Sequence, residues 1–571
     1  METNLQRAAI AGYERMAAWA DLLDDINVYP VADADTGRNL KISLAPIIGI
    51  ANSRTQIGRR LLHAATGNSG NIAAAFFAEF LGAESASQLP HKVGAASRRA
   101  RDAIAVPKPG TMLTVFDHLG QALGNATATD PVPVEIVDTL VAAVQATPDL
   151  LPELARAGVV DSGALGMFLF FEGFFKTLYE EKPAFVSLPA TFGAQLQLEA
   201  IPAAAQSDEI CINTLVKTDQ ESDALSLKLQ AVGNSIVTVK EGDHLKIHMH
   251  TKDLDRVRRK LKSWGDLVAW DTEEIQASAL AASPARTSGT KVHIVTDAAG
   301  SITRETAERL GITLLDSYII SGEQAGPESA VVPETLYSDM RAGRRISTAQ
   351  ASLFERHQSY ESLTSRFDRV LYLCVGSAYT GICQAAARWA EQAQSDSLTV
   401  FDSGAASGRL GLAAMAVAAF ANRGHPLDRV IAYARAAFAE CRELVFLDQL
   451  KYLAAGGRIS KASGFFGDLF SVKPVITPLA GGVQKIGTVR KNAQQVPLAL
   501  DYFSDRMEAG AKVRILLQYT DNRDRVASRI QPALQSAFPR AAITLTPLSL
   551  TSGVHMGPGT WGIAVLPEIT P

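Results

Sequence analysis

The chain has 571 residues, 47% of them hydrophobic, and a formal net charge of −4. This length suits roughly two to four domains, and the charge argues against a nucleic-acid scaffold, which would show a strongly basic domain. The four cysteines form no CxxC pair, which favours a reducing cytoplasm over a disulfide framework. The polar N-terminus lacks a signal peptide, and no apolar run is long enough to span a bilayer, so we expect a cytoplasmic protein.

The first part of the chain, up to about residue 179, is predicted to be helical. Residues 5–26 and 134–146 place apolar side chains three and four positions apart, the spacing of an amphipathic helix. Glycine-rich joints interrupt these helices at residues 66–71 and 158–166. From residue 180 to about 207 the composition changes to Pro- and Ala-bearing sequence, which we interpret as a linker.

The remaining chain is predicted to be α/β. Residues 209–216 form a candidate strand, and residues 234–251 alternate like a β-hairpin around the sequence EGD. After a second predicted linker, 277–290, strands alternate with helices to the end of the chain, which favours α/β layers with mainly parallel sheets. The predicted domains are 1–190 (all-α), 208–276 (small α/β) and 290–571 (two-layer α/β).

Asp33 and Asp35 are separated by one residue in a predicted turn within NVYPVADADTGRNL, residues 27–40. Two carboxylates this close repel each other unless a cation lies between them, and Mg²⁺ binds carboxylates together with nucleotide phosphates. Taken alone, this pattern is more often a turn with solvated acids. The stretch TGNSGN at 66–71 changes that balance, because its backbone N–H groups can approach an anion.

Four motifs follow one another in order: NVYPVADADTGRNL, GNSG (67–70), GTMLTV (110–115) and GVVDSGALG (158–166). Together they resemble the nucleotide-binding domain of the dihydroxyacetone kinase family, in its fatty-acid kinase branch. The resemblance implies an all-α helical barrel that binds ATP, with Mg²⁺ bridging aspartates and phosphates. It implies Asp33 and Asp35 as catalytic metal ligands, with Asn27 as a further candidate. The implied nucleotide-binding residues are Thr36, Gly37, Asn39, Asn68, Ser69, Gly70, Gly110 and Thr111.

The chain departs from this kinase pattern at three positions. Ala34 stands where glycine is usual, Arg38 replaces a small polar residue, and Thr66 replaces an arginine. Alanine tolerates fewer backbone angles than glycine, so the turn between the aspartates is expected to be tighter. No departure removes a candidate ligand, so an active kinase is still expected.

The last 280 or so residues contain a second series of motifs: IVTDAAGSIT, STAQAS, SAYTGICQAA, FDSGAASGRLGL, LKYLAAGGRIS, SVKPVI, VRKNAQ and HMGPGTWGI. In this order they resemble the DegV family of fatty-acid-binding proteins. The resemblance implies that Thr348 with Gln350, and Thr380 with Gly381, bind the fatty-acid carboxylate. It also implies that Arg490 and His555 assist phosphate transfer as catalytic residues. The residues expected mainly to shape the site are Asp297, Ser403, Gly457 and Arg458.

These implied roles agree with the chemistry of the side chains. Hydroxyls can donate hydrogen bonds to a buried carboxylate, and a guanidinium can neutralise phosphate charge. Without the resemblance, His555 before GPG would be interpreted as a turn histidine and Arg490 as a solvated charge at a helix start. Ala349 replaces a second hydroxyl and Ala298 a serine, so the geometry around the head group is expected to differ from the family pattern.

In the middle segment, the alternation of HLKIHMHT places His248 and His250 on the same strand face, opposite Ile247 and Met249. Cys211 lies on the preceding strand, and a Cys/His set suits Zn²⁺. Spacing alone favours a solvated strand face with one buried cysteine. However, the segment resembles the middle domain of the fatty-acid kinase, whose matching Cys and HxHT residues look like a metal site. Cys211, His248 and His250 are therefore predicted zinc ligands, with a structural or catalytic role left open.

The resulting hypothesis is a fused fatty-acid kinase. It would transfer the ATP γ-phosphate to the carboxylate of a bound fatty acid, giving an acyl phosphate for phospholipid synthesis and ADP. Alternatives are a kinase for a small molecule such as dihydroxyacetone, and a non-catalytic lipid-binding or regulatory protein. The expected ligands are ATP or ADP, Mg²⁺, a fatty acid and Zn²⁺. We expect a homodimer that binds no nucleic acid, is not an integral membrane protein and contacts membrane surfaces at most transiently.

Overall fold

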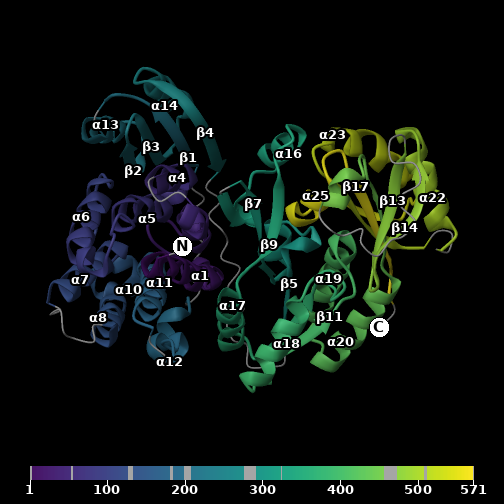
Figure 1. The fold of residues 1–571 in the computed structure, drawn as a ribbon, viewed down its shortest axis with the longest axis horizontal. Coiled ribbons are helices and arrows are strands. Elements are labelled where there is room, and N and C mark those ends of the chain that lie inside the picture. The colour runs from purple at the N-terminus through teal and green to yellow at the C-terminus, as the bar shows by residue number, and fades with distance from the viewer. Residues whose placement is uncertain are drawn as a thin grey trace. The chain divides into compact units, whose positions relative to one another are not determined.

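The computed structural model describes residues 3–52, 56–125, 133–180, 184–198, 208–220, 222–274, 291–322, 324–455, 472–506 and 511–569 (Figure 1). The chain divides into two compact units, residues 1–286 and 287–571. No helix in these ranges is both long and apolar enough to cross a membrane. Each unit is described separately below.

The first unit begins with an all-helical domain, which confirms the predicted helical character. Its α-helices are α1 (Asn4–Ala18), α2 (Ala20–Asp25), α3 (Thr36–Leu44), α4 (Ile57–Ala64), α5 (Gly67–Phe80), α6 (Leu89–Asp102), α7 (Met112–Asn125), α8 (Pro133–Gln145), α9 (Thr147–Leu150), α10 (Pro152–Ala157), α11 (Ser162–Leu178) and α12 (Leu188–Phe192).

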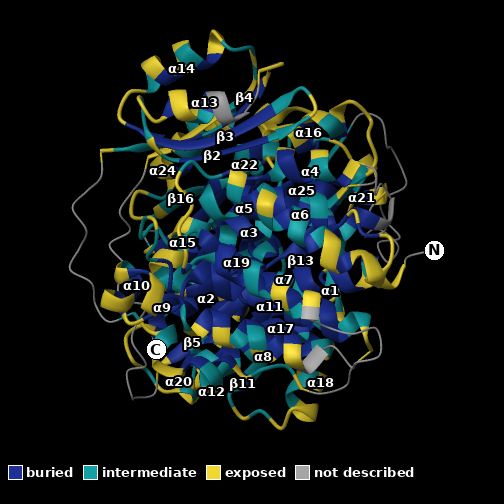
Figure 2. Ribbon diagram, turned by 90° about the vertical axis from the view of Figure 1, so that its left-hand side faces the viewer, coloured by how far each residue is buried: buried dark blue, intermediate teal, exposed yellow. Residues whose placement is uncertain are grey.

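Helix α11 forms the centre of this domain, because 15 of its 17 residues are buried. Its Phe171 makes edge-to-face ring contacts with Phe76 of α5 and Phe116 of α7, and dark blue buried residues mark α11 and its neighbours in Figure 2. Helices α1 and α11 approach closely at two glycines. A Cβ at Gly173 would lie 2.9 Å from the Ala11 carbonyl oxygen, and one at Gly12 would lie 2.6 Å from the Phe170 oxygen. The two glycines therefore allow α1 and α11 to approach this closely.

An ion pair between Arg15 of α1 and Glu172 of α11 lies in this core, and both side chains are completely buried. Arg15 Nε donates to Glu172 Oε2 at 2.8 Å, and the Val186 backbone N–H donates to Oε1 at 2.7 Å. Lys176 lies 3.8 Å from the same carboxylate. Because desolvated charges need their partners, removing one member of a buried pair is strongly destabilising.

Arg15→Met is therefore expected to lower the free energy of unfolding by about 3–5 kcal/mol. Urea denaturation of the full chain would measure this loss, with Arg98→Met as a matched control because Arg98 is exposed on α6. Equal stability of the two variants would contradict a contribution of the buried pair.

The segment predicted as a linker after residue 180 is partly structured, so that prediction was wrong for its described part. Helix α12 lies across the predicted boundary at residue 190. Leu188 is buried, and the Phe192 ring lies 6.0 Å from that of Phe168 on α11. These apolar side chains attach the segment to the helical domain.

The middle segment is a four-stranded antiparallel sheet with the strand order β2-β3-β1-β4. The strands are β1 (Ile210–Lys217), β2 (Asn234–Glu241), β3 (His244–Thr251) and β4 (Asp266–Glu274), and the helices are α13 (Ser222–Leu229) and α14 (Leu254–Lys262). The predicted hairpin is confirmed as β2–β3. Ile247 and Met249 point into an apolar core shared with Val257 and Leu261 of α14.

The alternative of a solvated strand face does not hold for the opposite face of this sheet, because His248 and His250 are buried. The reason is tertiary, because β2 and β3 pack against α5 of the helical domain. Thr238 donates its backbone N–H to the Ala103 carbonyl at 2.8 Å, and Arg99 pairs with Glu241. The middle sheet and the helical domain therefore belong to one unit.

The second unit contains three sheets, with strand orders β11-β10-β5-β6, β8-β7-β9 and β14-β13-β12-β17-β15-β16. The strands are β5 (Val292–Asp297), β6 (Ile312–Leu315), β7 (Ser317–Ser321), β8 (Gln324–Pro327), β9 (Ile346–Gln350), β10 (Arg369–Cys374), β11 (Leu398–Asp402), β12 (Arg442–Phe446), β13 (Lys473–Leu479), β14 (Gly482–Val489), β15 (Val513–Tyr519), β16 (Ala542–Pro547) and β17 (Trp561–Pro567).

The helices of this unit surround the sheets in Figure 1 and complete its α/β architecture. They are α15 (Arg304–Leu310), α16 (Pro333–Arg341), α17 (Leu353–Arg366), α18 (Ile382–Gln392), α19 (Ser407–Ala421), α20 (Leu427–Glu440), α21 (Lys451–Ala455), α22 (Gln495–Ser504), α23 (Arg523–Arg525), α24 (Gln531–Ala537) and α25 (Leu550–Met556). Helix α19, with most of its residues buried, packs against both larger sheets.

The prediction of mainly parallel sheets was wrong for two of these three sheets. The four-stranded sheet is parallel, but the three-stranded sheet is antiparallel. In the six-stranded sheet only β15 and β16 pair in parallel among the described strands. The physical reason is visible in β13 and β14, where a two-residue connection forms a hairpin, whereas a parallel pair requires a long crossover.

The sequence predicted no disulfide framework, yet the structure contains one disulfide bond. Cys374, at the end of β10, is bonded to Cys383 in α18, and their Cα atoms are 5.9 Å apart. The chain turns back between β10 and α18, so two cysteines nine positions apart meet. Cys211 and Cys441 are free thiols.

Candidate functional site

The acidic turn between α2 and α3 presents two carboxylates at the start of a helix. Asp35 is the N-cap residue of α3, yet its side chain accepts no capping hydrogen bond, so its carboxylate remains available to a ligand. Ala34, between the aspartates, has a φ of 54°, a left-handed conformation that disfavours any residue except glycine. The turn thus keeps the backbone form that glycine usually supplies, at a cost in strain.

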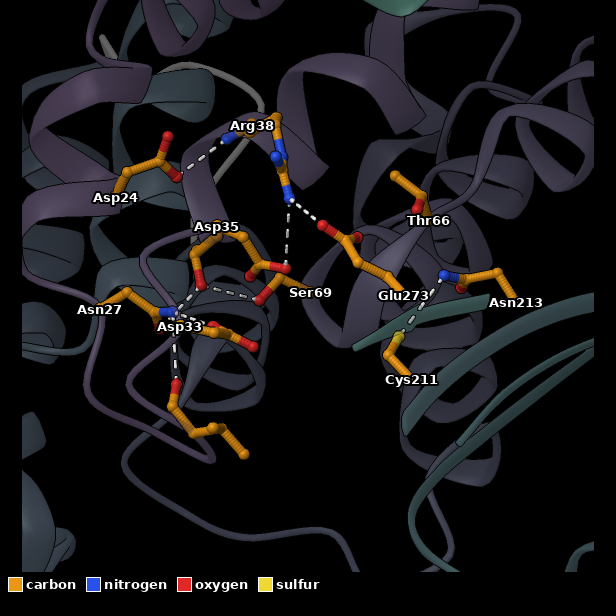
Figure 3. A network of polar contacts seen from close by, with 12 residues as sticks. Asp24, Asn27, Asp33, Asp35, Arg38, Thr66, Ser69, Cys211, Asn213 and Glu273 are labelled. Carbon is orange, nitrogen blue, oxygen red and sulfur yellow. Dashed lines mark hydrogen bonds and ion pairs between the residues drawn. The ribbon is translucent and has the colours of Figure 1, made fainter. Parts of the chain in front are cut away.

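Asn27 organises this turn (Figure 3). Its Nδ2 donates to Asp33 Oδ1 at 2.7 Å and to the Val31 carbonyl oxygen at 3.3 Å. Its Oδ1 accepts from Thr36 Oγ1 at 3.0 Å and from Ser162 Oγ at 3.4 Å. These hydrogen bonds make Asn27 a positioning residue for Asp33, and its candidacy as a further metal ligand stays a prediction.

The phosphate-loop candidate at the start of α5 lies beside this turn. Thr36 Oγ1 and Ser69 Oγ are 3.4 Å apart, which joins two of the predicted motifs. Gly67 has a φ of 62°, and a Cβ there would lie 2.0 Å from Nδ2 of Asn39. A Cβ at Gly70 would lie 2.0 Å from Oγ of Ser43, so both glycines allow α5 to pack on α3. The first N–H groups of α5 have no partner within the helix and can bind an anion.

Other predicted nucleotide residues take different roles. Gly37 allows α3 to contact α2, because a Cβ there would lie 2.0 Å from the Ala20 oxygen. Asn68 Oδ1 is buried without a hydrogen-bond partner among the described residues. Gly110 and Thr111 precede α7, where Thr111 Oγ1 donates to the Lys108 oxygen at 3.0 Å. No contact in the described residues joins Gly110 or Thr111 to the aspartates.

The electrostatics of the acidic turn fit a cation. Burial and the neighbouring Asp35 carboxylate raise the pKa of Asp33 to about 8. Two carboxyl groups this close in a half-buried turn favour keeping one proton unless a positive ion replaces it. A hard divalent ion bound through Asp33 and Asp35 would supply that charge.

We expect a pH-dependent stabilisation by Mg²⁺ from this arrangement. In chelator, Asp33 holds a proton in the folded chain that it loses in the unfolded chain, so stability should fall as pH rises from about 4 to about 8. Added Mg²⁺ should raise the melting temperature more at pH 8 than at pH 5. Differential scanning calorimetry would measure this, and Asp33→Asn should remove both the slope and the Mg²⁺ effect. If the melting temperature of Asp33→Asn responds to pH and Mg²⁺ as that of the parent protein does, Asp33 is not a Mg²⁺ ligand.

Arg38 links the acidic turn to the middle sheet (Figure 3). Its Nη2 lies 4.0 Å from Asp35 Oδ2 and 3.7 Å from Glu273 Oε1 on β4. The Arg38 backbone N–H donates to Asp24 Oδ1 at 3.0 Å. The departure from the family pattern at residue 38 therefore places a cation beside the candidate phosphate site.

Cys211, His248 and His250 converge on the buried face of the middle sheet. One potential ligand atom from each lies within 4.8 Å of the others. His248 Nε2 and His250 Nδ1 are buried without a hydrogen-bond partner in the described part of the chain. Asn213 Oδ1 lies 3.1 Å from His248 Nδ1, and this hydrogen bond orients the ring. The arrangement fits the predicted metal site.

The protonation states of this cluster also fit a metal. Burial lowers the pKa of both His248 and His250, so both imidazoles are neutral and able to ligate. Burial, followed by the charge of Asp35, raises the pKa of Cys211 to about 12, so the thiol stays protonated without a metal. Figure 3 shows Cys211 of this cluster in the same view as Asp33 and Asp35 of the acidic turn.

The purified full chain is therefore expected to bind one Zn²⁺ per chain at this cluster. Plasma mass spectrometry should find the metal in the parent protein and lose it in Cys211→Ser and His248→Gln. Cys441→Ser is the control, because Cys441 is the other free thiol and lies in the second unit. Full metal content in Cys211→Ser would refute the assignment.

In the second unit, Thr348 on β9 meets His555 on α25. Thr348 Oγ1 lies 3.0 Å from His555 Nε2, although 207 positions separate them. Helix α25 is capped by Ser549, and the buried Glu328 accepts hydrogen bonds from the N–H and hydroxyl of Thr551. Glu328 thus positions the helix that carries His555. Gln350 ends the same strand as Thr348 and is exposed.

Thr380 and Gly381 lie between β10 and α18. Thr380 Oγ1 is buried and has no hydrogen-bond partner among the described residues, so it is available to a ligand. Gly381 is exposed and is the N-cap residue of α18. Asp297 holds the start of this loop, because its Oδ2 accepts the Val375 N–H at 2.8 Å. The predicted shaping role of Asp297 agrees with this contact.

Arg490 follows β14 and is exposed, and its predicted catalytic role stays a prediction. Within the described residues, no contact joins its side chain to Thr348 or His555. Ser403 accepts the Ala405 N–H at 3.1 Å and shapes the turn after β11. Gly457 and Arg458 lie outside the described residues.

Some site residues were missed by the sequence analysis. Arg356 is buried, donates to the Asp316 carbonyl oxygen at 2.8 Å and lies 3.7 Å from Asp297 Oδ1. Neither Arg356 nor Glu328 lies in a recognisable motif. The one available signal for Arg356 is a charge at a position that helical spacing assigns to the buried face of α17.

Family models match three successive parts of the chain. Residues 30–176 match the DAK2 domain, residues 209–281 match the FakA-like middle domain of fatty acid kinase, and residues 291–568 match the DegV family. This chain joins a DAK2 domain, a fatty-acid-kinase-type middle domain and a DegV domain.

Curated relatives resemble parts of this three-domain chain. A DegV domain-containing protein of Caldanaerobacter subterraneus subsp. tengcongensis is 25% identical over 48% of this chain and 98% of its own length. An uncharacterised protein of Staphylococcus aureus (strain USA300) is 28% identical over 47% of this chain, and the match spans 54% of that relative's length.

Two solved structures resemble about half of the chain. A fatty-acid-binding DegV family protein from Thermus thermophilus has 25% identity and a TM-score of 0.46, over 49% of this chain and all of its own. DegV from Bacillus subtilis, described as a fatty acid binding protein, has 21% identity and a TM-score of 0.45, over 49% of this chain and all of its own.

Proposed function

We propose that this protein is a fused fatty-acid kinase that converts a fatty acid and ATP into an acyl phosphate and ADP. The observation that carries the proposal is the combination of domains: a DAK2 domain and a fatty-acid-kinase-type middle domain precede a DegV domain in one chain. The acidic turn supports the nucleotide half of the proposal, and the hydroxyl–histidine pair Thr348–His555 supports the lipid half.

In the nucleotide half, Thr36, Ser69 and the first N–H groups of α5 would bind the phosphates. Asp33 and Asp35 would hold Mg²⁺, which neutralises phosphate charge when bound. Asn27 would keep Asp33 in place through its 2.7 Å hydrogen bond. Positioning and charge neutralisation make up most of what phosphoryl transfer requires, so no covalent enzyme intermediate is needed.

In the lipid half, the hydroxyls of Thr348 and Thr380 would donate hydrogen bonds to the fatty-acid carboxylate. His555 would orient the Thr348 hydroxyl and, together with Arg490, would stabilise phosphate charge during transfer. One carboxylate oxygen forms a bond to the γ-phosphorus while the bond from that phosphorus to the β–γ bridging oxygen breaks, releasing ADP. The carboxylate is already ionised, so no proton has to be removed first. Joining both halves in one chain raises their effective concentration.

The test is ATP consumption by the full chain with and without oleate or palmitate. The proposal expects lipid-dependent turnover that is lost in Asp33→Ala, together with a fatty acid found by native mass spectrometry on the purified protein. Turnover with dihydroxyacetone alone would favour a small-molecule kinase. Lipid binding without any turnover would favour a non-catalytic lipid carrier, and either result would overturn the proposal.

A further inference from the structure

Helix α14 of the middle domain carries a dense cationic face. Five of its nine residues are arginine or lysine, and Asp255 is its one acidic residue. Val257 and Leu261 are buried against the sheet, so the basic side chains are left on the outward side. Yellow, exposed segments of α14 are visible at the top of Figure 2. The basic residues are Arg256, Arg258, Arg259, Lys260 and Lys262.

This charge is not neutralised by carboxylates within the described structure. None of the five basic side chains forms an ion pair with a carboxylate of the described residues. The dipole of α14 favours basic residues in its last turn, which accounts for Arg259, Lys260 and Lys262 but not for the earlier arginines. Arg256 and Lys260 are like charges four positions apart, as are Arg258 and Lys262, and such pairs destabilise a helix. Asp255, four positions before Arg259, offsets part of this repulsion, and the remaining positive charge favours an external anionic partner.

Apolar and aromatic groups border the cationic face. Leu227 on the neighbouring α13 is 68% exposed. Helices α13 and α14 are adjacent there, because Lys260 Nζ donates to the carbonyl oxygen of Lys228. The Lys260 ammonium lies 5.9 Å from the centre of the Trp264 ring, and the Arg258 guanidinium 5.5 Å from that of Trp270. Cations combined with aromatic rings and an exposed leucine suit the boundary between water and hydrocarbon.

We propose that this face, formed by the basic residues of α14 with Leu227 and Lys228 of α13, docks on an anionic phospholipid surface. The charge is complementary to such a surface, whereas the chain as a whole has a net charge of −4 and would be repelled. The inference rests on the proposed function, since an enzyme that phosphorylates fatty acids has a substrate that resides in membranes. Docking through the middle domain would hold the kinase near that source without a membrane span.

The experiment is co-sedimentation of the full chain with vesicles in the absence of nucleotide. Vesicles of phosphatidylglycerol and phosphatidylcholine should bind the parent protein, and pure phosphatidylcholine vesicles should not. Binding should decrease when salt is raised, because surface charges are screened. The variant Arg256→Gln/Arg258→Gln/Arg259→Gln/Lys262→Gln should bind at least about 100-fold more weakly, since each basic residue contributes roughly fivefold. Lys260 is kept because of its contact with α13.

A matched control removes the same charge elsewhere: Arg156→Gln/Arg388→Gln/Arg429→Gln/Arg435→Gln, at exposed positions outside the middle domain. Equal binding by the two quadruple variants would overturn the inference, provided that circular dichroism shows both to be folded. Loss of binding to a single-stranded oligonucleotide, with vesicle binding unchanged, would assign the face to nucleic acid instead. Asp35→Asn should keep vesicle binding, so failure of the kinase proposal would be distinguishable from failure of docking.

Discussion

Asp35→Asn is expected to lower the rate of lipid-dependent ATP turnover by about 10³-fold, the size of effect that follows removal of a group that stabilises transition-state charge. The substitution keeps the shape of the side chain, and Asp35 makes no capping hydrogen bond that the change could break. Steady-state kinetics with oleate would measure the loss in kcat. Fatty-acid binding should be unchanged, because the lipid-binding candidates lie in the other unit.

Asp102→Asn provides the control for this experiment, because Asp102 is an exposed carboxylate at the end of α6 in the same domain. It should retain parental turnover. If Asp35→Asn loses no more ATP turnover than Asp102→Asn does, the acidic turn holds no catalytic ion. A loss accompanied by a lower melting temperature in Mg²⁺-free buffer would indicate a folding defect instead.

The second large effect is expected at Thr348 and His555. Thr348→Val removes a hydroxyl proposed to bind the carboxylate and leaves a side chain of similar volume, so fatty-acid affinity should fall roughly 10- to 100-fold. His555→Gln should instead lower kcat, with a smaller change in lipid affinity, because a glutamine amide can still bond to Thr348. Isothermal titration and steady-state kinetics would separate the two effects.

Thr364→Val is a suitable control for Thr348→Val, because Thr364 bonds within helix α17. If Thr348→Val leaves lipid affinity unchanged while the fold is intact, the carboxylate does not bind at β9. If His555→Gln and Thr348→Val have the same effect on affinity and none on kcat, His555 serves binding only.

Local sequence patterns predicted much of the secondary structure, because the formation of a helix or a strand depends largely on residues that are close together in the sequence. The two-residue period of β3 placed His248 and His250 together, and the structure confirms that placement. The helical spacing of the first 180 residues and the alternation of strands with helices after residue 290 are also confirmed. Motif order along the chain indicated the three domains, which the family models match.

Strand direction and burial could not be predicted in this way. Antiparallel pairing in the six-stranded sheet depends on which distant strands meet, as with β12 and β17. The burial of His248 depends on the packing of the middle sheet against α5, and nothing in the strand itself records that neighbour. The bond between Cys374 and Cys383 likewise requires the turn between β10 and α18.

The sequence by itself determined the chemistry that this protein carries: an acidic turn, a glycine-rich helix start, a Cys/His set and a cationic helix, each a matter of residue type and short spacing. The tertiary structure decided which of these groups meet. Asn27 contacts Ser162 across 135 positions, and Thr348 contacts His555 across 207. Such contacts form because separate elements bury a common apolar core, and the free energy of that burial depends on the whole fold rather than on any single segment.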